Sequence, residues 1–119
     1  MKTLLTFTAI IEALTGLALI VASSLLSEVL LGQTINETQG IIIAMVAGVA
    51  LCSLAAGCWF LREDAAASGM VKALVCYNAG IVFIFVFSML TTELRSIPFA
   101  LVAFFHFGCA VWCGMILKN

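Results

Sequence analysis

Long apolar runs separated by short polar segments fill this chain from end to end. Four of them reach the roughly 20 residues that a helix needs to cross a bilayer, and we place them at 3–26, 40–61, 71–90 and 96–117. Short connections make consecutive helices antiparallel neighbours. The pattern therefore predicts an all-α integral membrane protein, with a single transmembrane domain over 1–119 folded as an up-down-up-down four-helix bundle.

The composition agrees with that class of protein. Hydrophobic residues make up 65% of the chain and charged residues 9%, and the mean hydropathy is +1.28. Soluble domains are about half apolar and a quarter charged, so the lipid bilayer is the expected surroundings. The net charge is −1 and the basic residues are scattered, which argues against nucleic acid as a partner.

The distribution of basic residues predicts the orientation in the membrane. Four of them flank the runs on one side, and only Arg95 is expected on the other; the four are Lys2, Arg62, Lys72 and Lys118. By the positive-inside rule both termini are cytoplasmic, and we expect the protein in the cell inner membrane of a bacterium. The segment "SEVLLGQTINETQG" then faces outward, and its first part, "SEVLLG", is expected along the outer interface.

Several polar side chains interrupt the apolar runs at similar depths. With a rise of about 1.5 Å per residue, Glu12, Tyr77 and Asn78 lie roughly 4 Å from the centres of their runs, and His106 lies within about 2 Å. An unpaired charge at this depth costs about 2.5–3.5 kcal/mol or more. We therefore predict one polar layer near the midplane, in which Glu12 turns inward and finds a donor on a neighbouring helix.

Two interpretations of Glu12 stay open at this point. Intramembrane carboxylates often belong to proton or cation pathways, but a neutral acid that bonds a neighbouring helix is equally compatible with the sequence. His106 has three candidate roles, as a proton relay, a haem ligand or a hydrogen-bond partner. As the single histidine of the chain, it would supply only one axial ligand to haem.

A ladder of small residues marks the second run. Its members recur at every fourth position and let a neighbouring helix approach closely; they are Gly40, Ala44, Gly48, Cys52 and Ala56. We interpret this ladder as a helix-packing surface.

No motif for catalysis or metal binding stands out. The five cysteines all fall inside the predicted spans without a CxxC pair, and such cysteines usually behave as small apolar residues. His106, Cys109 and Cys113 share one helical face, but no other ligand cluster supports a metal site. We predict no catalytic residue, no metal and no enzymatic activity.

Five stretches carry a resemblance to known proteins: "IEALTGLALI", "SEVLLG", "AGVALCSLAAGCWFLR", "CYNAG" and "FHFGCAVWC". They touch all four runs. With them the chain resembles an uncharacterised family of small four-helix bacterial membrane proteins, and is loosely similar to the DoxX group. That resemblance implies an accessory role near quinone-dependent electron transfer and carries over no catalytic residue.

A second resemblance is to small multidrug resistance transporters, which share the length, the four helices and a coupling glutamate at a position like that of Glu12. The stretch "CYNAGIVFIF" replaces the tryptophan-serine-glycine type of sequence expected in their third helix. The sequence thus favours a non-enzymatic accessory subunit of a larger membrane complex, one handling quinone or another lipophilic molecule, with self-association also open. The alternative is a proton-coupled small-molecule carrier that uses Glu12, and a third interpretation is a redox protein whose cofactor His106 holds.

Overall fold

The computed structural model describes residues 1–93 and 96–118, and these residues form helices without any strand. In chain order the helices are α1 (Lys2–Val21), α2 (Ser23–Leu31), α3 (Thr38–Leu61), α4 (Ala67–Thr91) and α5 (Ile97–Lys118). All but α2 are long and apolar enough to cross a membrane, as the four runs predict. Arg95, which enters the prediction of orientation, lies outside the described residues.

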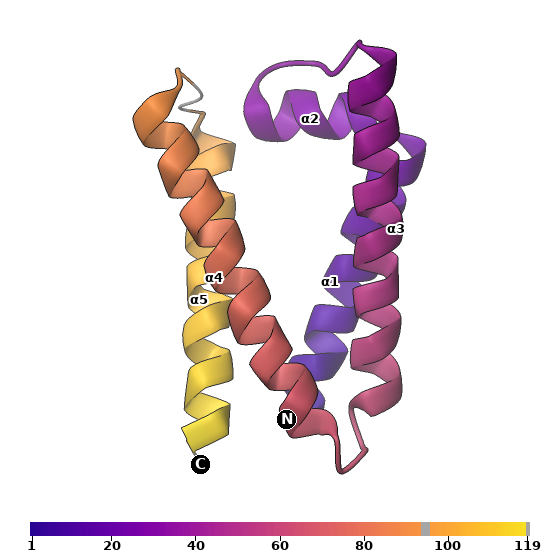
Figure 1. Cartoon of the computed structure of the whole chain (residues 1–119), viewed down its shortest axis with the longest axis vertical. Coiled ribbons are helices and arrows are strands. Elements are labelled where there is room, and N and C mark those ends of the chain that lie inside the picture. The colour runs from indigo at the N-terminus through magenta and orange to yellow at the C-terminus, as the bar shows by residue number, and fades with distance from the viewer. Residues whose placement is uncertain (94–95, 119) are drawn as a thin grey trace.

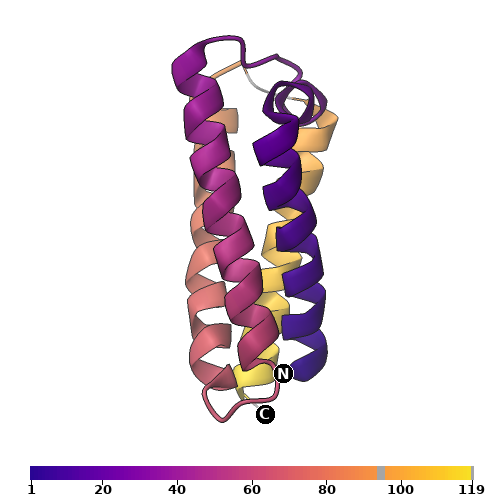
Figure 2. The same cartoon turned by 90° about the vertical axis from the view of Figure 1, so that its right-hand side faces the viewer.

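The long helices form two pairs. Helix α1 packs chiefly on α3, and α4 packs chiefly on α5. The pairs meet at one end of the molecule and diverge toward the other, where α2 lies across them (Figure 1). Both termini lie at the end where the pairs meet, as Figure 2 also shows. Because Lys2, Arg62 and Lys118 also belong to that end, we call it the basic end, and the other the α2 end.

The best-packed core lies at the basic end, where the two pairs meet. Leu4 and Leu5 of α1, Cys58 of α3, and Val71 and Leu74 of α4 are fully buried there. Lipid tails are as apolar as leucine, so close van der Waals packing, rather than removal from water, stabilises such a core in a membrane. This core therefore joins the two helix pairs at the basic end.

The predicted end of the first helix at residue 26 is wrong. Helix α1 ends at Val21, and α2 begins at Ser23 after a break at Ala22, whose φ of −145° and ψ of 42° are not helical. The Ser24 hydroxyl donates to the Ile35 carbonyl at 2.6 Å, and the Ile35 amide donates to the Ser27 hydroxyl at 3.0 Å. These bonds tie α2 to the connection that follows it, and hydropathy alone does not reveal them.

The remaining helices lie within four residues of the predicted bounds. Helix α2, which contains most of "SEVLLG", lies crosswise in the opening between the two pairs (Figure 1). The Ser96 hydroxyl donates to the Leu30 carbonyl at 2.8 Å and so joins α2 to the start of α5.

In the structure the middle of the predicted packing ladder lies at the contact between α3 and α1. Ala44 and Gly48 are buried, and Cys52 lies against α1 beside Gly16. The two ends of the ladder lie elsewhere: Gly40 packs on Ile35 of the preceding connection, and Ala56 is exposed.

The reason is the pitch of the helix. A stripe at every fourth position drifts around an α-helix of 3.6 residues per turn, so the buried face passes from Gly48 to Ala55 and Cys58 instead of to Ala56.

Candidate functional site

The structure brings together the four polar residues predicted to share a layer. The Tyr77 hydroxyl of α4 donates to Glu12 Oε2 of α1 at 3.3 Å. Next to Tyr77, Asn78 Oδ1 lies 2.8 Å from Nδ1 of His106 on α5. The rings of Tyr77 and His106 meet edge to face, with centroids 5.8 Å apart. The layer therefore draws on both helix pairs, and Tyr77 joins its two halves.

Glu12 is deeply buried, with 6% of its surface exposed, and its hydrogen bond is a weak one. O–H···O bonds usually measure about 2.5–3.0 Å, and the bond from Tyr77 exceeds that range. No ion pair to Glu12 occurs among residues 1–93 and 96–118. Burying an unpaired charge costs far more than burying a neutral acid, so this geometry suits a protonated Glu12 that accepts from Tyr77.

The amide of Asn78 fixes the tautomer of His106. Asn78 Nδ2 donates to the Leu74 carbonyl at 2.7 Å, which orients the amide and leaves Oδ1 facing the histidine. Since Oδ1 only accepts, Nδ1 of His106 must carry a hydrogen. In the neutral ring Nε2 is then an acceptor, so His106 is arranged to receive a proton or to bind a donor at Nε2.

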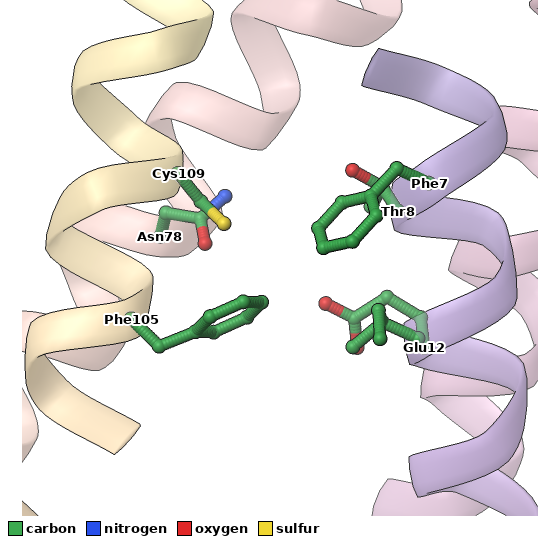
Figure 3. A pocket seen from close by; sticks show the side chains of 7 residues that line it. Phe7, Thr8, Glu12, Asn78, Phe105 and Cys109 are labelled. Atoms are coloured by element: carbon green, nitrogen blue, oxygen red, sulfur yellow. The ribbon is translucent and has the colours of Figure 1, made fainter. Parts of the chain in front are cut away.

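A small cavity of about 10 Å³ lies between α1 and the α4–α5 pair. Its lining combines apolar side chains with the polar groups of Thr8, Glu12 and Asn78, and Figure 3 shows these groups facing one another across the gap between the elements. One water molecule needs about 10–15 Å³ and two to four polar partners. The cavity thus fits one water but not a small-molecule substrate, whose sites typically measure about 300–1,000 Å³.

Sequence reasoning missed the aromatic contact beside this cavity. The Phe7 ring of α1 lies between two rings of α5, with centroids 6.3 Å from Phe105 and 5.9 Å from Trp112. Phe105 and Phe7 both line the cavity, and they point toward one another (Figure 3). Phe105 directly precedes His106, and Phe7 lies five residues before Glu12. These positions indicate the aromatic contact only once the polar layer is known.

The described residues contain neither a disulfide nor a cluster of metal-ligating side chains. The cysteines Cys52, Cys58, Cys76, Cys109 and Cys113 are all free thiols, and the described part of the chain holds no group of three or more histidine, cysteine or acidic side chains able to hold a metal. Cys109 contributes its side chain to the small cavity.

Comparison of the chain with family models, curated proteins and solved structures gave no match.

Proposed function

We propose that this chain is a non-enzymatic integral membrane protein that acts as a subunit or partner in a larger membrane assembly. The observation that carries the proposal is that the rest of the chain buries only a minority of the residues in each long helix. In its most apolar 18-residue window, α1 buries 33% of the residues, α3 buries 22%, and α4 and α5 bury 11% each. Most of the surface of α4 and α5 is thus available to lipid or to other helices.

The exposed face of α4 suits a partner helix in particular. Four small residues at helical spacing face away from the rest of the chain: Gly69, Ala73, Cys76 and Gly80. A Cβ added to Gly80 would meet nothing within 4 Å. Small residues at such spacing allow another backbone to come close, and close approach is what drives helix association in lipid. Phe83 and Phe87, both largely exposed, extend this face toward the α2 end.

The same proposal includes the topology. The four long helices would cross a bacterial inner membrane up-down-up-down, with both termini in the cytoplasm. Its support is that Lys2, Arg62 and Lys118 belong to the end that holds both termini (Figure 1), whereas Glu28 and Glu37 lie near the α2 end. The DoxX-like stretches support a partner complex that handles quinone or another lipophilic molecule.

The native mass of the protein, extracted in mild detergent from its own membrane, tests the proposal. We expect a mass that includes foreign subunits, and a mass of one or two copies of this chain would overturn it. Gly80→Phe should release the partner because it blocks the small face of α4. Gly114→Phe on α5 is the matched control, since a Cβ there also meets nothing within 4 Å, and it should leave the partner bound.

A proton-coupled small-molecule carrier is the second candidate, and one observation favours it. Glu12 lies between the two helix pairs, accepts a hydrogen bond across them from Tyr77, and borders a water-sized cavity. Loss of its proton would place a charge between the pairs and favour their separation, which a substrate would need in order to enter. Uptake in vesicles should then be lost in Glu12→Gln while the fold is retained; full uptake by that variant would exclude this candidate.

A further inference from the structure

We propose that the half of the α1–α3 surface next to the basic end binds one phospholipid with an anionic head group. The acyl chain would lie in a hollow of about 420 Å³ between the two helices. Small side chains form its floor, and Trp59 and Phe60 of α3 wall its end; the floor includes Ala9, Ala13, Cys52 and Ala56. We call this hollow the seam groove. Its small residues leave the space that a larger side chain would have filled.

The cationic side chain of Arg62 lies next to the end of the seam groove. A second hollow of about 340 Å³ is lined by Trp59, Phe60, Arg62 and Glu63. It shares Trp59 and Phe60 with the seam groove, so the apolar surface leads directly to the guanidinium of Arg62. Arginine is well suited to phosphate because its planar donors bind two oxygens at once.

Arg62 is held in place before any lipid arrives. Its Nη1 donates to the Trp59 carbonyl at 2.5 Å, and its guanidinium carbon lies 3.7 Å from the centre of the Trp59 ring. One donor is used in the first contact, and the remaining donors of the guanidinium can reach a phosphate. A fixed cation loses little conformational entropy on binding, which favours affinity.

The nearest acidic side chain, Glu63, lies closer to Lys2 than to Arg62. Lys2 Nζ lies 2.8 Å from Glu63 Oε1, whereas Arg62 Nε is 3.8 Å from the same oxygen. The hydrogen bond from Lys2 lowers the pKa of Glu63 and offsets its charge. Asp64 Oδ1 accepts the Ala66 amide at 2.7 Å. Because Lys2 is the closer partner of Glu63, the guanidinium of Arg62 can direct its positive charge toward an anionic head group.

The distance along α3 from the inner end of the seam groove to Arg62 matches one leaflet of a bilayer. Ten residues separate Cys52 from Arg62, which corresponds to about 15 Å of helix. The hydrocarbon core is about 30 Å thick, so a chain that starts at Arg62 would end near the midplane at Cys52. A further hollow along α3, lined by Ile20, Ile42, Met45 and Val46 among others, contains no charged side chain. This further hollow is therefore apolar like the groove, but it offers no cation that could bind a phosphate.

Native mass spectrometry of the full chain tests this site, with phosphatidylglycerol and phosphatidylethanolamine as the probes. We expect the protein to retain one phosphatidylglycerol and to prefer it over phosphatidylethanolamine by about fivefold. This is the ratio of affinities that one interfacial cation provides. Arg62→Gln should abolish the preference, and Ala56→Phe should expel the lipid by filling the groove. Ala56 is exposed, so that variant should fold.

Lys118→Gln is the matched control, because it removes one positive charge at the same end without touching the groove. It should retain the lipid and its preference. Equal retention of the two lipids by the unmodified protein would overturn the proposal, and so would an unchanged preference in Arg62→Gln. A lipid-free dimer that Ala56→Phe dissociates would show instead that a second copy covers the groove.

Discussion

Gly16 of α1 and Gly48 of α3 bring the two helix backbones into direct contact. A Cβ on Gly16 would lie 2.7 Å from the Gly48 carbonyl oxygen, and a Cβ on Gly48 would lie 2.6 Å from the Gly16 carbonyl oxygen. Both separations are below 3.0 Å, a limit that real Cβ atoms essentially never cross. The contact is reciprocal, so neither helix can accommodate a methyl group without a shift of backbone.

We therefore expect Gly16→Ala and Gly48→Ala each to destabilise the α1–α3 pair by about 1–3 kcal/mol, the usual cost of overpacking. Thermal unfolding in detergent measures the effect. Gly108→Ala on α5 is the control, since its Cβ would meet nothing within 4 Å, and it should be neutral or slightly stabilising because alanine favours helix. Equal stability of Gly48→Ala and Gly108→Ala would contradict the close contact.

The Glu12–Tyr77 bond predicts a specific pattern of variant stabilities. Glu12→Gln keeps an acceptor for the Tyr77 hydroxyl and should be tolerated, whereas Glu12→Leu leaves that hydroxyl without its partner. Side-chain hydrogen bonds in membranes contribute about 0.6 kcal/mol on average and up to about 1.7. A double-mutant cycle of Glu12→Leu with Tyr77→Phe, followed by reversible unfolding in mixed micelles, should give a coupling in that range. Strictly additive effects would show that the pair does not interact.

The long helices and the polar layer can be predicted from sequence for the same physical reason. Hydrocarbon offers no hydrogen-bond partner, so a run of apolar residues must be helical, and a polar group inside it must turn toward another helix. Glu12, Tyr77, Asn78 and His106 meet this condition at similar depths, and the structure places them in one connected group.

Other features escape prediction because lipid and protein interior select the same side chains. Phe7 contacts Trp112, while Phe104 is largely exposed, and nothing in their apolar character separates them. The break at Ala22 depends on serines that bond Ile35, a residue eight or more positions away. Hydropathy is averaged along one segment, so it does not reveal hydrogen bonds between separate segments.

The Lys2–Glu63 ion pair predicts a small pH dependence at the basic end. The bond from Lys2 holds the pKa of Glu63 below its usual value. A lowered folded-state pKa means that the pair contributes stability above the ordinary range of a carboxyl group, and that this contribution disappears as the pH falls through the lowered pKa.

Lys2→Gln should therefore lower the melting temperature slightly at neutral pH and not at all in strong acid. Both side chains are largely exposed, so added salt should also reduce the difference. Lys118→Gln provides the comparison, since no ion pair of Lys118 occurs in the described part of the chain. A difference that persists unchanged into strong acid would have to come from something other than this pair.

His106 offers a direct test of the polar layer, because it is the single histidine of the chain. In protein labelled with ¹⁵N-histidine, the neutral ring should carry its hydrogen on Nδ1, where Asn78 Oδ1 accepts at 2.8 Å. Asn78→Leu removes that acceptor and should shift the population toward the Nε2–H tautomer. Tyr77→Phe keeps the ring contact and the Asn78 bond, so its spectrum should resemble that of the unmodified protein. A neutral Nε2–H ring in the unmodified protein would mean that Asn78 does not orient His106.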